Sequence, residues 1–186
     1  SKCINEHDKL VRAWHPGLKF PVGFKKFDFD RCSSLGDEVV SALGADITFL
    51  SMAAARYITN RGVQSMASIA KSLTTLDFGD SASISGDRFQ WLPKSLRFLE
   101  LGASEQIHDH HIKFLPRELL YAYLNSAIHL TDNCFKTLPH FMQTLRIDKN
   151  ILITIESLPL WPTSLRCSGS FYCAKFSCIN GKINSK

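Results

Sequence analysis

The stretch LPKSLRFLELGASEQIHD at residues 92–109 decides the fold, because its pattern returns as LPRELLYAYLNSAIHLTD at residues 115–132. Leu96 and Leu119 are equivalent positions 23 residues apart, and Ile107 and Leu130 have the same separation. A repeat of this length is typical of solenoids, in which short units stack on one another. The sequence therefore predicts a repeat architecture, although it names no partner.

Extending this alignment in both directions predicts seven strand segments, each with three apolar positions. The first position holds Phe24, Ile47, Leu73, Leu96, Leu119, Met142 and Leu165. The second position holds Phe27, Leu50, Leu76, Leu99, Ala122, Leu145 and Ser168. The third position holds Phe29, Met52, Phe78, Leu101, Leu124, Ile147 and Ser170. Because the last two positions are two residues apart, they fit the side-chain alternation of a short strand.

Each strand segment is followed by an apolar turn position and by a pattern that predicts a short helix. The turn position holds Leu35, Ile58, Ile84, Ile107, Leu130 and Ile153. Apolar residues five and eight positions later fit one face of a helix. Asp37, Asn60, Asp109 and Asp132 come where side chains can cap the helix starts. Prolines at 93, 116, 139 and 162 stop the helices, and three extra residues near Ala67–Ala70 predict one added helical turn.

The strand residues between the apolar positions should point away from the core and form the solvent-exposed face of a parallel sheet. Several of them are more apolar or aromatic than a solvated sheet surface needs, and tyrosine and arginine are common binding anchors. Packing between neighbouring strands is the alternative explanation. The residues predicted to bind a partner are Phe49, Arg97, Phe98, Glu100, Leu120, Tyr121, Tyr123 and Arg146.

Two further groups of residues could carry chemistry. Three histidines beside Asp109, at positions 108, 110 and 111, invite a zinc interpretation, but adjacent helical residues do not converge on one point. We therefore expect capping by Asp109, with the histidines on the solvent side, and no metal. Cys167, Cys173 and Cys178 match no zinc spacing, and structural thiols explain them better than a metal or a disulfide.

The composition is that of an ordinary globular chain, with 45% hydrophobic and 21% charged residues among 186. The net charge of +5 is mild and the basic residues are spread out, so nucleic acid is not an expected partner. There is no apolar run long enough for a membrane helix, no basic-then-apolar leader and no paired CxxC motif, so we expect a reducing, intracellular and cytoplasmic location. No nucleophile elbow or phosphate-binding loop is found, so we expect no enzyme, no cofactor and no small-molecule substrate.

The segment Phe24-x-x-Phe27-x-Phe29-x-x-Cys32-x-x-Leu35-Gly36-Asp37 resembles the leucine-rich repeat, LxxLxLxx(N/C)xxL. Cys32 and the turn after it resemble the cysteine-containing subtype known from F-box-type receptors; Asn150 and Cys173 occupy the same site in later repeats. The other repeats depart from it with alanine or serine there. The resemblance implies an α/β solenoid (horseshoe), with a parallel sheet on the concave face and short helices on the convex face.

We interpret residues 1–186 as one such domain, with a partial N-terminal repeat or cap at 1–23, about six to seven repeats at 24–170, and a C-terminal cap and tail at 171–186. Phe171, Tyr172 and Phe176 are expected to cover the end of the core, and Gly181 to Lys186 to be a loose tail. The resemblance implies a non-enzymatic scaffold that binds another protein on its concave face. Two alternatives stay open: a substrate-receptor module of a ubiquitin ligase, with its F-box-like part upstream of Ser1, or a structural subunit of a large assembly.

Overall fold

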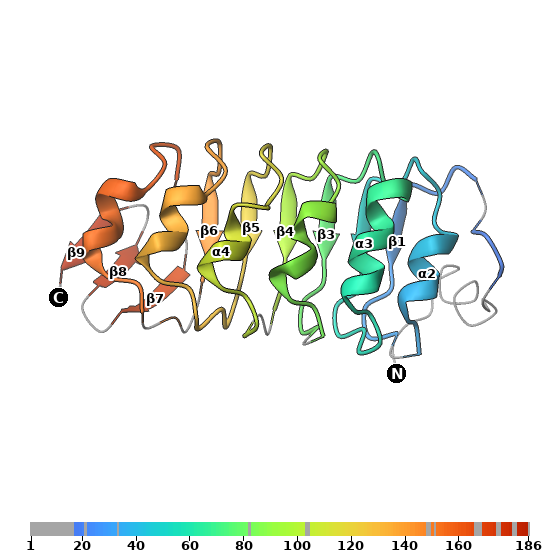
Figure 1. Cartoon of the computed structure of the whole chain (residues 1–186), viewed down its shortest axis with the longest axis horizontal. Helices are drawn as coiled ribbons and strands as arrows, with labels where there is room; N and C mark the ends of the chain where they lie inside the picture. The colour runs from blue at the N-terminus through green and yellow to red at the C-terminus, as the bar shows by residue number, and fades with distance from the viewer. Residues whose placement is uncertain are drawn as a thin grey trace.

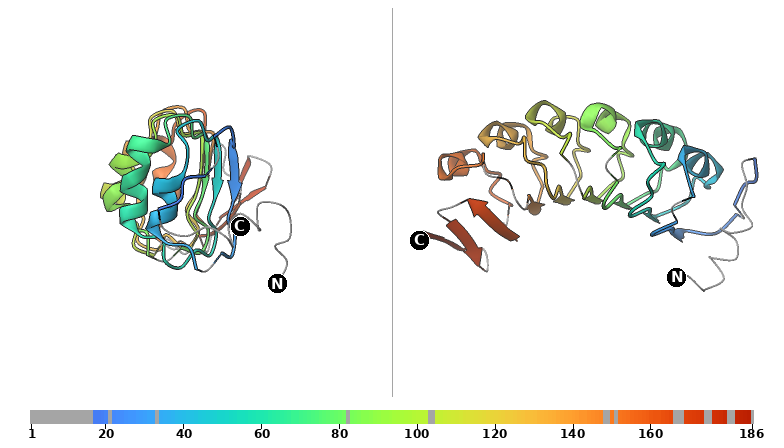
Figure 2. Two further views of the ribbon diagram at one scale, coloured as in Figure 1. Left: turned by 90° about the vertical axis from the view of Figure 1, so that its right-hand side faces the viewer. Right: turned by 90° about the horizontal axis from the view of Figure 1, so that it is seen from below.

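The computed structural model describes residues 17–20, 22–32, 34–81, 83–102, 105–147, 150 and 152–165, and the backbone of 169–173, 176–179 and 182–185. The described repeats form a curved stack, in which strands line the inner, concave side and helices the outer, convex side (Figures 1 and 2). Each repeat is one strand, one loop, one short helix and one turn, as the repeat alignment predicts.

Six strands form one parallel sheet whose spatial order follows the chain, β1-β2-β3-β4-β5-β6. The strands are β1 (Lys26–Asp28), β2 (Phe49–Ser51), β3 (Thr75–Asp77), β4 (Phe98–Glu100), β5 (Tyr121–Tyr123) and β6 (Thr144–Arg146). Their register pairs equivalent residues, so that Leu50 lies beside Leu76 and Leu99 beside Ala122. The strand alignment from residue 24 to residue 147 is therefore confirmed.

The helices are α2 (Asp37–Ala42), α3 (Asn60–Ile69), η1 (Gly86–Trp91), α4 (Asp109–Ile112), η2 (Asp132–Thr137) and η3 (Ile155–Leu160). The three η segments are 3-10 helices, a form that proteins use in short pieces. Helix α3 has ten residues where the others have six or fewer, which confirms the predicted helical insertion.

A single apolar core runs through the stack. All six described members of the second strand position and all six of the third are buried, as are all members of the turn position. A lone unit could not bury its apolar face, so stacking of neighbours supplies the stability. The first strand position is buried from Ile47 to Met142, but Phe24 is 36% exposed because it lies in the first repeat, on the edge of the sheet. Phe20, as expected for the end of an earlier repeat, is buried against Phe27 and Phe29.

The prediction of a seventh strand in the parallel sheet is wrong for the described residues. Strand β7 (Gly169–Cys173) instead pairs antiparallel with β8 (Phe176–Ile179), and β8 pairs with β9 (Lys182–Ser185). Ser168 and Ser170 stand where other repeats carry apolar core residues, so this segment lacks the apolar face that would continue the stack. The expected loose tail is also wrong for 182–185, which forms β9.

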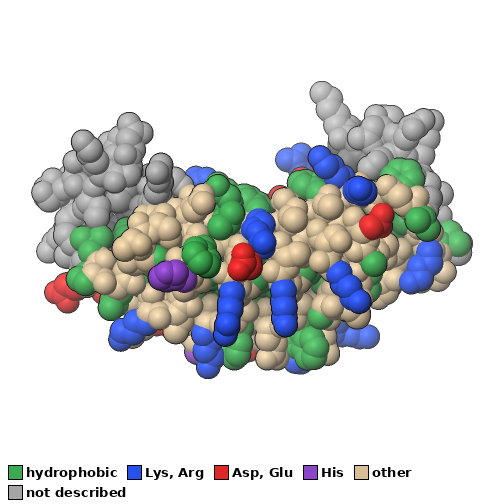
Figure 3. Space-filling view, turned by 90° about the horizontal axis from the view of Figure 1, so that it is seen from above, with side chains coloured by type: hydrophobic (Ala, Val, Ile, Leu, Met, Phe, Trp, Pro, Cys, Tyr) green, Lys and Arg blue, Asp and Glu red, His purple; other side chains and the backbone are tan. Residues whose placement is uncertain are grey.

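The two long edges of the stack differ in their connections. Short helix-to-strand turns form one edge, which we call the turn edge, and longer strand-to-helix loops form the other. Figure 3 looks onto the turn edge. The prolines sit in these turns: the carbonyl oxygens of Pro93, Pro116 and Pro139 each accept from the backbone N–H three residues on, at 3.0–3.1 Å. None of the helices among the described residues has the length and apolar character that crossing a membrane requires.

Polar side chains at the helix starts join neighbouring repeats, which corrects the predicted capping. Asp37 is the first residue of α2, but its carboxylate accepts from the N–H of Thr59 at 2.8 Å and of Gly62 at 3.0 Å, both in the next repeat. Asp109 likewise accepts from the N–H of Thr131 at 2.8 Å and from its hydroxyl at 2.6 Å. Each side chain thus supports the helix start of the following repeat.

Asn60 and Asp132 continue this ladder with Ser85 and Thr154. We call the side chains Asp37, Asn60, Asp109 and Asp132 the helix-start ladder. Hydrogen bonds between repeats, and not only apolar stacking, therefore fix the register of the solenoid.

Candidate functional site

The concave face is built from three-residue strands. In each of β3, β4 and β5 the middle side chain is buried and the two flanking side chains are only partly buried. Because side chains alternate along a strand, the flanking pair points away from the core. Parallel register then aligns these side chains into rows across the sheet, as the sequence predicts.

Four predicted side chains come together on β4, β5 and β6. The rings of Phe98 and Tyr123 make an edge contact with centroids 5.1 Å apart, and the Arg146 guanidinium lies over the Tyr123 ring at 5.8 Å. Tyr121 pairs directly with Phe98 across the strands, and its hydroxyl donates to Gln143 Oε1 at 2.8 Å. We call Phe98, Tyr121, Tyr123 and Arg146 the aromatic patch.

The other predicted residues lie at different distances from this patch. Leu120 and Arg97 precede β5 and β4 and border the patch, and Arg97 is 3.5 Å from Glu118. Glu100 ends β4, in register with Tyr123. Phe49 lies apart on β2, with Thr75 of β3 between it and Phe98. The structure thus gathers seven of the eight predicted residues on or beside β4–β6.

Carboxylates gather at the ends of strands β1, β3 and β4, a group from which the prediction selected only Glu100. Buried Ser51 donates to Asp30 and, at 3.2 Å, to Asp77. Burial, and secondarily the charge of Asp30, raises the pKa of Asp77 despite a bond from the Gly79 N–H. Burial and the nearby Asp77 likewise raise the pKa of Glu100. The sequence signal was present, because Asp77 and Glu100 hold the same position in consecutive repeats.

The histidine group lies on the convex side, where the helix-start ladder is interrupted. Gly86 occupies the ladder position in its repeat, and the ring of His111 fills the space that a side chain there would take. His111 Nδ1 accepts from the N–H of His108 at 3.0 Å, as the ladder carboxylates do elsewhere. His111 is therefore buried, with a side chain 5% exposed, which corrects its predicted place on the solvent side. His108 and His110 are exposed, as predicted.

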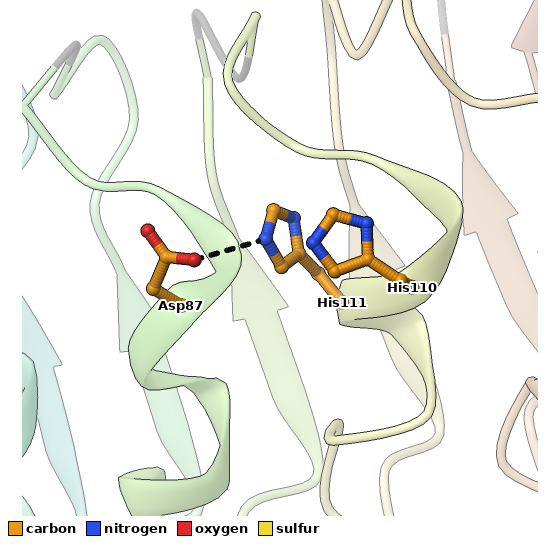
Figure 4. Close-up of side chains that lie close together, drawn as sticks. All are labelled: Asp87, His110 and His111. Atoms are coloured by element: carbon orange, nitrogen blue, oxygen red, sulfur yellow. Dashed lines mark hydrogen bonds and ion pairs between the residues drawn. The ribbon is translucent and has the colours of Figure 1, made fainter.

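Among the described residues, Asp87, His110 and His111 form one group with the spacing of a metal site (Figure 4). Their candidate ligand atoms lie within 4.8 Å of one another. However, His111 Nδ1 accepts a backbone hydrogen bond, so the neutral ring carries its proton on Nε2, which donates to Asp87 Oδ1 at 3.2 Å. A metal at Nε2 would require that nitrogen's lone pair and would break the bond from His108. The geometry therefore favours a structural role.

The pKa values in this group follow from its packing. Burial, aided by the neighbouring His110, lowers the pKa of His111, although Asp87 opposes that shift. The hydroxyl of Ser85 donates to Asp87 at 2.8 Å and is the main cause that lowers the pKa of Asp87. A neutral His111 is the form that accepts from His108, so protonation would remove this bond at the start of α4.

Asn150 shows which hydrogen bonds a side chain can make at the asparagine or cysteine position of the repeat. Its amide donates to the carbonyls of Ala127 at 2.7 Å and Leu130 at 2.8 Å, and its oxygen accepts from the N–H groups of Leu152 and Ile153. Cys32 is half-buried at the same position of the first repeat. The side chains of Cys167, Cys173 and Cys178 lie outside the described residues.

The fold is similar to those of several solved structures. One is a chain of the yeast Rad7 and Elc1 complex, with a TM-score of 0.65 and 16% identity over 76% of this chain and 39% of that one. A second is the leucine-rich repeat-containing protein LegL7 from Legionella pneumophila, with a TM-score of 0.58 and 16% identity over 82% and 61%. A third is internalin C2 from Listeria monocytogenes, with a TM-score of 0.54 and 16% identity over 80% and 75%.

These likenesses, with the parallel sheet and short helices, define the class of fold: this is a leucine-rich-repeat solenoid. At 16% identity they show the fold alone, and the chain spans less than two thirds of the first two structures. No protein-family model and no curated protein sequence matches the chain.

Proposed function

We propose that the chain is a non-enzymatic scaffold that binds another protein through the concave face at β4–β6. The aromatic patch carries this proposal. Two tyrosines, a phenylalanine and an arginine gather on adjacent strands, and each stays at least partly exposed. These residue types are enriched among binding hot spots. Interstrand packing alone would not require an arginine over a partly exposed tyrosine ring.

The partner is expected to cover the patch and the residues beside it, which are Arg97, Glu100 and Leu120. The negative charge of Glu100 is not fully compensated within the chain, because burial and Asp77 raise the pKa of Glu100 more than Arg146 lowers it. A basic group of the partner placed near Glu100 would relieve this repulsion. We therefore expect the partner to present apolar side chains to the tyrosines and a lysine or arginine to Glu100.

The test is affinity purification from cell extract followed by quantitative mass spectrometry. Phe98→Ala and Tyr121→Ala should lose the partner that the native chain captures, while their circular dichroism and melting remain native-like. Thr75→Ala is the matched control, because it changes a concave residue of β3 outside the patch. Retention of the partner by both patch variants would contradict the proposal.

A substrate-receptor module is the second candidate, and one observation favours it. The fold likeness includes Rad7, which forms a complex with Elc1, and Cys32 stands at the site that resembles the cysteine-containing repeat subtype. A receptor would also bind an adaptor through a helical segment outside the repeats. Co-purification of an adaptor that survives the patch substitutions would support this role, whereas loss of every bound protein on patch substitution would count against it.

We further propose that residues 1–186 act as one domain, with 1–23 and 171–186 closing its two ends. Phe20 supports the first closure, because it packs on Phe27 and Phe29 at the end of the core. Limited proteolysis should leave a fragment that includes both end segments. Rapid removal of residues 171–186 without loss of melting temperature would contradict a capping role.

A further inference from the structure

A second surface, distinct from the concave face, carries a row of basic side chains, three of which are lysine or arginine. Lys71, Lys94, Arg117 and His140 occupy the same position in four consecutive helix-to-strand turns, and all four are exposed. We call these residues the turn-edge row. Figure 3 shows Lys and Arg side chains following one another along this edge, with hydrophobic side chains between them.

The cations of this row are not neutralised by nearby carboxylates. Within the part of the chain that the structure describes, neither Lys71, Lys94 nor Arg117 has an ion-pair partner. Glu118 follows Arg117 in sequence, but its carboxylate lies 3.5 Å from Arg97. The row is therefore available to an acidic ligand, and like charges in successive turns favour one that carries several negative groups.

A groove lies between the turn that joins η1 to β4 and the turn that joins α4 to β5, and both Lys94 and Arg117 line it. Its volume is about 470 Å³, and it is lined by residues of both turns, including Leu92, Phe114, Pro116 and the acidic Glu118. Phe114 is 38% exposed in this position. The apolar walls and the two cations fit an apolar side chain flanked by carboxylates, because Glu118, the acidic residue of the lining, is already paired with Arg97.

The aromatic rings on the turn edge favour an acidic peptide over a nucleic acid as the ligand of this surface. Single-stranded nucleic acids are held by aromatic rings on which bases stack. The ring of Phe114 already carries the Lys113 ammonium at 4.8 Å from its centroid. His140 likewise lies against the ring of Phe141 at 5.4 Å. Both rings are thus partly covered by neighbouring side chains, which would hinder base stacking, and the Lys113 ammonium would still attract carboxylates.

We propose that the turn edge binds an acidic protein segment, whose carboxylates meet Lys94 and Arg117 and whose apolar side chain enters the groove beside Phe114. This surface is independent of the aromatic patch and extends the proposed scaffold role to a second contact.

The test uses fluorescence anisotropy with tag-free protein and a labelled peptide of glutamates around a central phenylalanine. Lys94→Gln combined with Arg117→Gln should weaken binding by about tenfold and reduce its salt dependence. Phe114→Ala should weaken it by about threefold, because one wall of the groove is lost. Arg56→Gln is a control that removes one positive charge on the opposite edge, and it should change affinity by less than about twofold.

Three outcomes would overturn the proposal: equal weakening by Arg56→Gln, equal binding of a peptide with glutamine in place of glutamate, or tighter binding of an oligothymidylate at the same residues. Failure here would leave the proposed function standing. Phe98→Ala should not alter binding of this peptide, and the double charge variant should still present the aromatic patch.

Discussion

The helix-start ladder and the concave face use polar and aromatic side chains in opposite ways. On the ladder, Asp37, Asp109 and Asp132 satisfy the helix start of the next repeat, and their bonds are complete within the chain. On the concave face at β4–β6, Tyr123 contacts Phe98 and Arg146 but remains partly exposed. Tyr121 donates a hydrogen bond to Gln143 and is also partly exposed. The difference separates side chains that hold the repeats together from side chains that are available to another molecule.

Gly86→Ala should have the largest effect, a loss of stability, because Gly86 lies where the helix-start ladder is interrupted. A methyl group there would lie 2.1 Å from the His111 ring, and the ring is buried. We expect a loss of about 3 kcal/mol in the free energy of unfolding, measured by chemical denaturation. Gly44→Ala is the control, because its added carbon would meet only an Asp46 oxygen, at 3.0 Å. Equal stability of the two variants would contradict the packing of His111 against Gly86.

Tyr123→Ala should reverse this pattern by reducing partner binding more than stability. Removing a hot-spot aromatic typically weakens binding by about 2 kcal/mol, or about 30-fold in the dissociation constant. The fold should lose less than about 1 kcal/mol, because the side chain is only partly buried. Surface plasmon resonance with the captured partner would measure the first change and thermal melting the second. A stability loss larger than the binding loss would place Tyr123 with the structural side chains.

Asp109→Ala tests the ladder itself. The substitution leaves the N–H and hydroxyl of Thr131 without their acceptor at the helix start. We expect a loss of about 1–2 kcal/mol in stability and no change in partner affinity. Asp46→Ala, at an exposed carboxylate in a turn, should change stability by less than about 0.5 kcal/mol. Matching losses in both variants would mean that the ladder bonds contribute little.

The pH dependence of stability should show the smallest effect. The pKa of His111 is lowered in the folded chain from its ordinary value of 6.5. The unfolded chain therefore binds a proton that the folded chain does not, and stability falls as pH decreases from about 6.5 through the folded pKa. Above that range the contribution is fully present. Chemical denaturation at several pH values would measure how the free energy of unfolding changes with pH. His111→Asn should reduce this dependence, and His140→Gln should leave it unchanged.

The sequence is sufficient to predict the strands and core because stacking demands one apolar residue at the same place in every repeat. Leu50, Leu76 and Leu99 could be aligned by counting alone, and parallel register then aligned the outward residues Phe98, Tyr121 and Tyr123. The added turn of α3 could also be predicted, because three extra residues shift the count. For the strands and the core, the periodicity of the sequence and the burial in the structure identify the same residues.

Contacts between repeats could not be predicted in the same way. Asp109 looked like a cap for its own helix, but its carboxylate reaches Thr131, which only the three-dimensional spacing of repeats reveals. His111 looked solvent-exposed because its burial depends on the missing side chain at Gly86, in the preceding repeat. Charge coupling between Asp77 and Glu100 is likewise a property of neighbouring strands.

The central claim is that the partner covers the concave face at β4–β6. Hydroxyl-radical footprinting of the chain with and without its captured partner would test it most directly, because tyrosine side chains report their own exposure. Tyr57, which is 66% exposed and lies in a strand-to-helix loop, supplies the internal control. We predict that oxidation of Tyr121 and Tyr123 falls on binding while that of Tyr57 is unchanged. Protection of Tyr57 with unchanged oxidation of Tyr121 and Tyr123 would contradict the claim.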